Sequence, residues 1–389
     1  AYAMRYKTNR LFRDTNAWYH FAFLVDTRLS TASERTQIYV NGVLETSFSV
    51  SVVPGQNSLF DWTTNIYVGK GGAAADADMS GYLSEFVYLD DTKAAHTDLG
   101  EFDSDTGIWI PIDVSGLTFG TNGAYLDFKD SSNMGNDANG GTDFTETNIS
   151  SADQATDTPT NNFAIGNILT SAGGFLVPTE GATKGVLSTS GPGNNTGGAS
   201  LFSTIPVSNG KWYFEAQNTN SGDVYLYLGV GDVGGIENWG IDGKTLGSAT
   251  GPSVGWRGGG AQDGKVYINN SATGSADTWE TEVVGVALDL DNNKVYFHKS
   301  GTYINSGDPA SGTDNGGQYD LPTAVDDQWC IGVSAYNLAT WLLNFGGYTT
   351  MSISSAASDG YGYGTFEYAP PSGYLALCTK NLASDGGSA

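Results

Sequence analysis

Three tryptophans in the second half of the chain lie in glycine-rich stretches and are interleaved with polar side chains. An indole offers a flat apolar face to a sugar ring, while carboxylate, amide and guanidinium groups can hydrogen-bond to its hydroxyls. The stretches are residues 232–260 and 270–282, and the candidate ligand-binding residues in them are Asp232, Asn238, Trp239, Trp256, Arg257 and Trp279. Because aromatic side chains also commonly fill a protein core, burial of these tryptophans is the alternative interpretation.

A second candidate site lies in a run of acidic and amide residues near the middle of the chain. Asp137, Asn139 and Asp143 offer side-chain oxygens at short intervals, and Gly141 between them offers a backbone carbonyl. This spacing is similar to the start of an EF-hand loop, and Asp130 upstream adds a carboxylate, so the run is a candidate calcium site. The flanking helices and closing Glu of an EF-hand are absent, and the alternative is an Asx-rich turn that satisfies its own backbone.

The sequence contains no residue arrangement that is typical of an active site. A glycosidase needs two carboxylates across a groove, and the run Glu101–Asp105 begins like the E-x-D-x-x-E strand of jelly-roll β-glucanases. Thr106, however, stands where that pattern has its last acid. His20, His96 and His298 lie in separate segments without metal-ligand spacing. We therefore expect no enzymatic activity, and a polysaccharide-degrading enzyme is kept as the third alternative.

The elements that must position these residues are β-strands. The 389 residues include 54 Gly, 21 Tyr, 17 Phe and 9 Trp, and only 15% are charged. Short aromatic and β-branched runs separated by Gly, Asn, Asp and Ser are typical of β-sandwiches and barrels. Strands or hairpins are expected at residues 17–26, 36–45, 65–69, 81–89 and 283–298. The Asn41-Gly42 step predicts a type I′ turn, Asp291–Asn293 predicts a second hairpin turn, and a short helix is expected at 91–99.

The net charge of −25 restricts the partners of the chain. A polyanion repels nucleic acid and anionic membranes, so neither is an expected partner. No apolar run approaches the roughly 20 residues of a membrane-spanning helix, and no signal-peptide pattern opens the sequence. Cys330 and Cys378 lie in apolar, strand-like runs, and we expect both to be buried free thiols.

A polar segment divides the sequence into two regions. Ser, Thr, Asn, Asp and Gly dominate residues 117–162, which we predict to be a linker. A first β-sandwich is expected over residues 1–116 and a second over residues 163–382, followed by a disordered tail at 383–389.

Three runs in the first region, Trp18–His20, Tyr39–Gly42 and Gly81–Glu85, follow one another in the order found in a known fold. They resemble the second half of a laminin-G or concanavalin-like jelly roll. The first region has fewer strand-like runs than a complete sandwich of that kind. An incomplete sandwich would leave sheet edges that need a cover, so we expect residues 1–116 to pack against further sequence or another subunit.

The second region contains the runs Gly210–Glu215, Gly285–Leu290 and Trp341–Gly346. They resemble a SPRY domain, a family that binds its partners through loops at one end of the sandwich. Together the two resemblances imply an all-β fold class with two tandem jelly-roll β-sandwiches, the first incomplete at its N-terminus.

The tandem order, the segment Asp153–Asn162 and the ending Pro370–Leu382 together resemble a group of marine bacteriophage virion proteins. This resemblance implies a place on the virion surface, in a tail fibre or another host-facing appendage. The implied activity is non-covalent recognition of a host surface glycan or protein, and the implied partners include other virion subunits in a homo-oligomer. The alternative is a purely architectural role, as a capsid decoration or fibre-shaft module.

Overall fold

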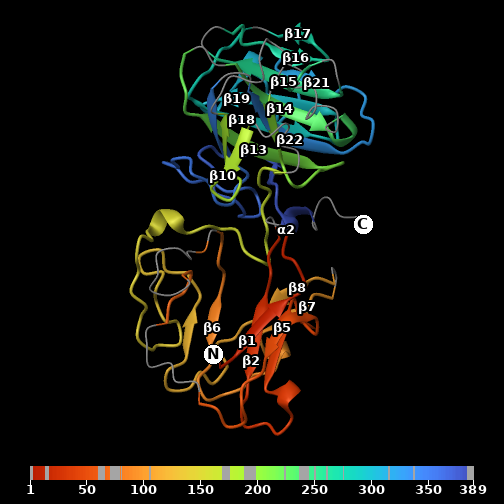
Figure 1. Ribbon diagram of the computed structural model, residues 1–389. Helices are drawn as coiled ribbons and strands as arrows, with labels where there is room; N and C mark the ends of the chain where they lie inside the picture. The colour runs from red at the N-terminus through yellow and green to blue at the C-terminus, as the bar shows by residue number, and fades with distance from the viewer. Residues whose placement is uncertain are drawn as a thin grey trace. The chain divides into compact units, whose positions relative to one another are not determined.

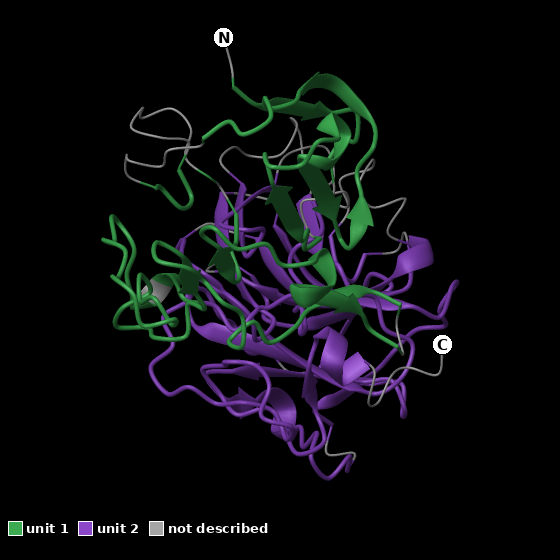
Figure 2. Cartoon of the chain, turned by 90° about the horizontal axis from the view of Figure 1, so that it is seen from below, with its two compact units in different colours: residues 1–154 green, residues 155–389 purple. Residues whose placement is uncertain are grey.

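The structure is a computed structural model with two compact units, residues 1–154 and residues 155–389, which are coloured separately in Figure 2. Its elements are almost all strands (Figure 1), so the chain is an all-β protein as predicted. Among the residues that the structure describes, no helix is long and apolar enough to cross a membrane. The structure describes residues 3–13, 17–59, 66–70, 79, 81–104, 107–168, 176–187, 199–222, 225–235, 245–248, 251–259, 262–274, 276–313, 316–335 and 338–382.

The first unit contains short strands in small antiparallel sheets. In the described residues these sheets are β1-β5, β2-β3-β4, β6-β9 and β7-β8. The strands are β1 Arg5–Thr8, β2 Phe21–Val25, β3 Thr36–Val40, β4 Val43–Leu44, β5 Phe48–Val52, β6 Phe86–Tyr88, β7 Gly100–Phe102, β8 Trp109–Pro111 and β9 Ala124–Leu126. The 3-10 helices are η1 Ala32–Glu34, η2 His96–Asp98 and η3 Ser151–Asp153.

The local predictions for the first unit are confirmed in part. Asn41 and Gly42 have φ values of 48° and 73°, which the type I′ turn between β3 and β4 requires. The helix expected at 91–99 is only the single turn η2, and Asp91, at its expected start, has a φ of 53°, which is not helical. Residues 66–69 form no strand, and residue 65 lies outside the described residues.

Residues 117–162 are not a linker, which corrects the prediction. Phe119 and Tyr125 pack with Val114 in the core of the first unit, and β9 pairs with β6. The boundary between the units falls between Gln154 and Ala155. The polar composition was misleading because the acidic side chains in this segment bind backbone N–H groups, as Asp137 does with the amide of Tyr125 at 2.9 Å.

The second unit is a sandwich of two sheets. One sheet has the order β10-β11-β23-β13-β18-β19-β20, with β21 paired to β19 and β24 paired to β13; the other has the order β12-β22-β14-β15-β16-β17. The strands of the first sheet are β10 Leu176–Thr179, β11 Lys184–Leu187, β13 Lys211–Asn218, β18 Val283–Asp289, β19 Lys294–Lys299, β20 Thr302–Tyr303, β21 Gln318–Asp320, β23 Ala339–Asn344 and β24 Leu375–Ala376. Those of the second are β12 Ala199–Phe202, β14 Leu226–Asp232, β15 Ser253–Gly258, β16 Val266–Ile268, β17 Ser271–Thr273 and β22 Trp329–Ala335. The short helices η5 Ile304–Ser306 and α2 Thr379–Asn381 also belong to this unit.

Strand β13 shows why the central strands of this unit are apolar on both faces. Trp212 and Phe214 point into the core between the sheets. Tyr213, on the opposite face, packs against Phe366 and Tyr374 of the C-terminal segment. A strand that is covered on both sides has no solvent face on which to place polar residues. The predicted burial of Cys330 and Cys378 as free thiols is confirmed.

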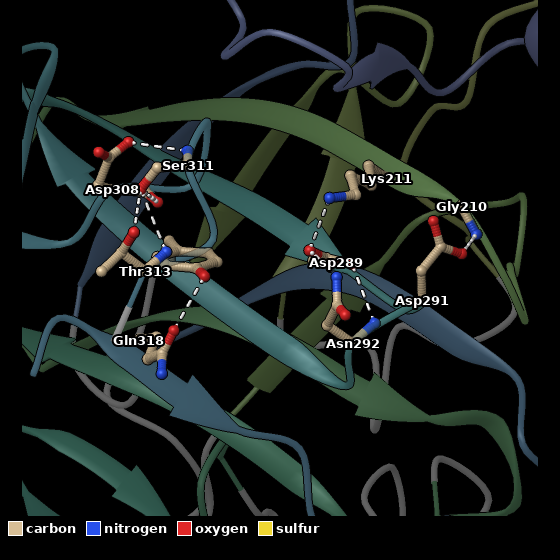
Figure 3. A network of polar contacts seen from close by, with 10 residues as sticks. Gly210, Lys211, Asp289, Asp291, Asn292, Asp308, Ser311, Thr313 and Gln318 are labelled. Atoms are coloured by element: carbon tan, nitrogen blue, oxygen red, sulfur yellow. Dashed lines mark hydrogen bonds and ion pairs between the residues drawn. The ribbon is translucent and has the colours of Figure 1, made fainter. Parts of the chain in front are cut away.

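The turn between β18 and β19 is fixed by the carboxylate of Asp289 (Figure 3). It accepts hydrogen bonds from the backbone and side-chain nitrogens of Asn292 at 3.1 and 2.9 Å, and it forms an ion pair with Lys211 at 2.9 Å. Asn293 adopts a φ of 53°, so the predicted hairpin turn is confirmed. The predicted disordered tail at 383–389 lies outside the described residues.

Candidate functional site

Two of the predicted ligand-binding tryptophans are core residues, which corrects their assignment to a binding surface. Trp256 is 0% exposed and Trp279 is 1% exposed. Their ring centroids lie 5.5 Å apart, and Trp341 continues the row at 5.6 Å from Trp279. The Trp256 indole also donates to the carbonyls of Gly264 and Asp277 at 3.1 and 3.2 Å. A ring that is enclosed in this way has no face left for a sugar.

Asp232 is also buried, and its role is to hold a loop. Its carboxylate accepts hydrogen bonds from the backbone amides of Val325 and Asp326, the first at 3.2 Å. Asn238 and Trp239 lie outside the described residues. Of the six predicted ligand-binding residues, Arg257 is therefore the one that the described part of the chain places partly in solvent.

Arg257 lies on the outer face of the smaller sheet, among tyrosines from two other segments. The centre of its guanidinium group is 5.6 Å from the ring of Tyr225, 5.9 Å from Tyr227 and 5.6 Å from Tyr267. All four side chains are half-buried. We call this group, together with Asp263, the Arg257 surface.

The strand register explains how the Arg257 surface is assembled. On β15, Trp256 points into the core, so the next residue, Arg257, points outward. Tyr227 on β14 lies directly opposite Arg257, and Tyr267 on β16 lies opposite Gly255. Next to this surface, the segment 245–248 covers the sheet, since a Cβ atom on Gly255 would lie only 2.7 Å from the backbone of Leu246.

A chain of hydrogen bonds links the cation of the Arg257 surface to an acid. The Arg257 guanidinium donates to the Tyr267 hydroxyl at 3.3 Å, and that hydroxyl donates to the Asp263 carboxylate at 2.6 Å. Desolvation acts to raise the pKa of Asp263, but the hydrogen bonds from Tyr267 and the Lys265 amide, together with the charges of Arg257 and Lys265, outweigh it and lower that pKa. The bond to Asp263 raises the pKa of Tyr267. Desolvation acts to lower the pKa of Arg257, but Tyr227, Tyr267 and Asp263 outweigh it and raise that pKa.

The Arg257 guanidinium is half-buried and is not neutralised by an ion pair within 4 Å in the described residues. Its Nε is buried without a hydrogen-bond partner, so only the outer nitrogens of the group can face a ligand. A guanidinium has five N–H donors in a planar fork that matches paired oxygen acceptors. Tyrosine rings beside such a fork provide apolar faces together with polar edges. The arrangement is suited to binding a polar ring.

The tyrosines of the Arg257 surface were missed by the sequence reasoning, although a signal for them exists. In the run Tyr225–Val230, tyrosine alternates with leucine at the first four positions. That alternation predicts a strand with an apolar face and an aromatic outer face. The prediction of a binding surface rested on tryptophan and glycine content, but Trp256 and Trp279 lie in the core.

The carboxylates predicted to bind calcium accept hydrogen bonds from neighbouring groups of the same segment. Asp137 accepts hydrogen bonds from the amides of Tyr125 and Asn139, while Asp143 accepts from the amide of Asp137 and the side chain of Asn133. Asp130 binds the backbone and hydroxyl of Ser132, and a Cβ atom on Gly141 would lie 2.2 Å from the Asp137 carboxylate. No group of three or more His, Cys, Asp or Glu residues in the described ranges could hold a metal. These contacts are those of an Asx-rich turn, and calcium binding by the same residues stays a prediction.

A second cluster of titratable groups, which the sequence did not reveal, lies beneath the C-terminal segment. The amide of Gly301 donates to Nδ1 of His298, which places the ring proton on Nε2. That nitrogen lies 2.7 Å from the Tyr213 hydroxyl, which donates to Glu215 Oε1 at 2.9 Å. Burial lowers the pKa of His298 to about 3. All three residues are at most 1% exposed, so the cluster is part of the interior.

Glu215 is the centre of this buried cluster. Besides Tyr213, it accepts hydrogen bonds from the amides of Glu367 and Tyr368 at 2.9 and 2.8 Å and from Asn344 at 3.2 Å. Burial raises the pKa of Glu215 to about 7, although these four donors act to lower it. The carboxyl group joins β13, β23 and the C-terminal segment, which makes it a structural anchor of the second unit.

The sheets define an all-β protein whose second unit is a two-sheet sandwich. No family model and no curated protein matches the sequence. Among solved structures, the chain is similar to the PSpry domain of TRIM65, at 13% identity and a TM-score of 0.31, over 47% of this chain and 92% of that domain. It is also similar to the SPRY domain of human HERC1, at 12% identity and a TM-score of 0.28, over 41% of this chain and 86% of that domain.

Proposed function

We propose that this chain is a non-enzymatic recognition module of a virion appendage, such as a tail fibre, which binds a glycan on the host surface without covalent chemistry. The place on a virion is supported by the resemblance of the tandem order and of the ending to bacteriophage virion proteins. A host surface protein is the alternative ligand. Nucleic acid and membrane are not proposed as partners, because the net charge of −25 repels both.

The observation that carries the proposal is the half-buried guanidinium of Arg257 between three tyrosine rings. The planar fork can donate pairs of hydrogen bonds to neighbouring hydroxyls or to a carboxylate on a sugar. The tyrosines can stack on the apolar faces of the same sugar, which is worth about 1 kcal/mol for each ring by analogy with aromatic pairs. A site of this size binds weakly as a single copy, so useful affinity would come from repetition over several copies.

Arg257→Lys is expected to weaken glycan binding by about tenfold or more, because lysine keeps the charge but loses the planar fork. The measurement is the binding of the full chain, displayed in many copies on a particle, to a panel of immobilised bacterial surface polysaccharides. Tyr267→Phe should weaken binding in the same direction, because it removes the hydroxyl between Arg257 and Asp263.

Lys380→Ala is the matched control for this experiment. Lys380 lies over the ring of Tyr363 at 5.7 Å, so its removal deletes a cation–π pair of the same kind away from the Arg257 surface. Binding should be unchanged in this variant. Equal binding by Arg257→Lys, Tyr267→Phe and the native chain would rule out the Arg257 surface as the glycan site.

A purely architectural role is the second candidate function, and one feature favours it. The first unit exposes large apolar side chains on β2, with Phe21 43% and Phe23 65% exposed. Such side chains are typical of a contact between subunits. The two functions are compatible, because one unit can assemble while the other binds a ligand.

A further inference from the structure

A second cation, Lys265, borders the Arg257 surface. The amide of Arg257 donates to the carbonyl of Lys265 at 3.0 Å, and the next pair along, Trp256 and Val266, is in register across β15 and β16. Arg257 and Lys265 are therefore directly opposite each other, and the side chains of such a pair lie on the same face of the sheet. Both residues are half-buried. Two cations thus share one face in a chain that has 17 Lys and Arg against 42 Asp and Glu.

The charge of these two cations is only partly balanced. Like charges directly opposite each other on paired strands are destabilising. Asp263 is close enough for its charge to interact with both cations, but in the described ranges neither cation forms an ion pair within 4 Å. The Asp263 carboxylate instead accepts hydrogen bonds from the Tyr267 hydroxyl at 2.6 Å and from the Lys265 amide at 3.3 Å. Among these three side chains one positive charge is in excess, which an anionic ligand would offset.

The geometry of Arg257 favours a carboxylate as that anion. The outer nitrogens of a guanidinium can donate two parallel hydrogen bonds to the two oxygens of one carboxylate, and such bonds are about twice as strong as those between neutral groups. The rings of Tyr225 and Tyr227 lie 5.6 and 5.9 Å from the guanidinium centre. They provide aromatic faces for the sugar ring that carries the carboxylate.

We infer that the Arg257 surface selects a sugar acid, whose carboxylate binds the Arg257 guanidinium beside the Lys265 ammonium while its ring packs on the tyrosines. This inference rests on the proposed function, in which the Arg257 surface binds a glycan. It adds the class of sugar, a uronic acid within a surface polysaccharide, and it adds Lys265 as a residue that determines specificity.

The acidity of the chain does not prevent this contact. The net charge of −25 repels any polyanion at long range. At physiological salt, however, exposed charges are largely screened beyond about 8 Å. The charges that act on a bound carboxylate are therefore the near ones, and those of Arg257 and Lys265 outnumber that of Asp263.

The test compares sugar acids with their uncharged counterparts. The full chain is displayed in many copies and bound, at about 150 mM salt, to immobilised polyglucuronate, polygalacturonate and polymannuronate. Each polymer is paired with its carboxyl-reduced form, in which a hydroxymethyl group replaces the carboxylate and the rest is unchanged. The native chain should bind at least one acidic polymer more than about tenfold more tightly than its reduced form, because hydrogen bonds to charged groups are the stronger ones.

Lys265→Gln should weaken binding to that acidic polymer by about fivefold and leave binding to the reduced form unchanged, because it removes one partly exposed charge. Lys265→Arg should retain the preference for the acid. The melting temperature should stay nearly unchanged in both variants. Lys184→Gln is the matched control, because Lys184 is a half-buried lysine on β11 of the other sheet. It removes the same charge from the same unit and should bind like the native chain.

The outcomes separate this inference from the proposed function. Equal binding to acidic and reduced polymers, weakened in Arg257→Lys, would overturn the selection of an acid and keep the glycan-binding function. A chain that binds neither kind of polymer would count against both. Equal losses in Lys265→Gln and Lys184→Gln would assign the effect to net charge and overturn the role of Lys265.

Discussion

Glu215→Ala is expected to destabilise the second unit by about 3–5 kcal/mol. The substitution removes the acceptor of four buried donors, from Tyr213, Asn344, Glu367 and Tyr368. A buried donor that loses its acceptor costs about 1–3 kcal/mol. Chemical denaturation of the full chain, followed by tryptophan fluorescence, measures the loss, because the five most deeply buried tryptophans of the described residues all lie in this unit.

Glu215→Gln is the informative companion variant, because it resembles the neutral acid and keeps one acceptor oxygen. Burial raises the pKa of Glu215 from 4.5 to about 7, so the proton is bound more tightly in the folded state than in the unfolded state. The stability that this group contributes is complete below about pH 4.5 and is lost as the pH rises through about 7. Glu215→Gln should lack that part of the pH dependence and should cost less than Glu215→Ala. Two variants with equal losses and the native pH profile would contradict the anchoring role of Glu215.

Trp256→Ala is expected to lower the free energy of unfolding by about 3–5 kcal/mol, because it leaves a cavity in the core. Trp256 is enclosed by Trp279 and Phe297, at centroid distances of 5.5 and 5.9 Å, and its indole N–H is hydrogen-bonded. The same denaturation experiment measures the effect. A binding-surface tryptophan would instead lose ligand binding at unchanged stability.

Tyr361→Ala is the control for the tryptophan variant. Tyr361 belongs to the same unit but is 56% exposed, so its truncation should change stability by no more than about 0.5 kcal/mol. If Trp256→Ala were as mild as Tyr361→Ala, the assignment of Trp256 to the core would be wrong.

Turns and strands were predictable because their signals are local. The Asn41-Gly42 step has few alternatives to a type I′ turn, and the structure confirms it. The apolar run before Asp291 predicted a strand, and β18 is that strand, buried on both faces. In both cases the conformation follows from residues within a few positions of one another.

The candidate site could not be predicted because it depends on partners distant in sequence. Trp256 and Arg257 are adjacent, but the pleat of β15 sends one into the core and the other outward. Which of the two faces the core depends on which side the other sheet covers. The same limit applies to Asp137, whose carboxylate could serve a metal or a backbone amide, and the folded turn places the Tyr125 amide within its reach. The anchoring role of Glu215 could not be predicted, because three of its four hydrogen-bond donors come from segments more than 125 residues away in the sequence.

The central claim, that the Arg257 surface binds a glycan, is tested most directly by fluorine NMR on the full chain labelled with 3-fluorotyrosine. Tyr225, Tyr227 and Tyr267 are assigned by single Tyr→Phe variants, and the polysaccharide that binds in the panel experiment is then titrated in. These three resonances should shift together as the polysaccharide saturates the chain, and in Arg257→Lys the same shifts should require about tenfold more polysaccharide. If the three resonances remain fixed while those of other tyrosines move, the ligand binds elsewhere and the account is contradicted.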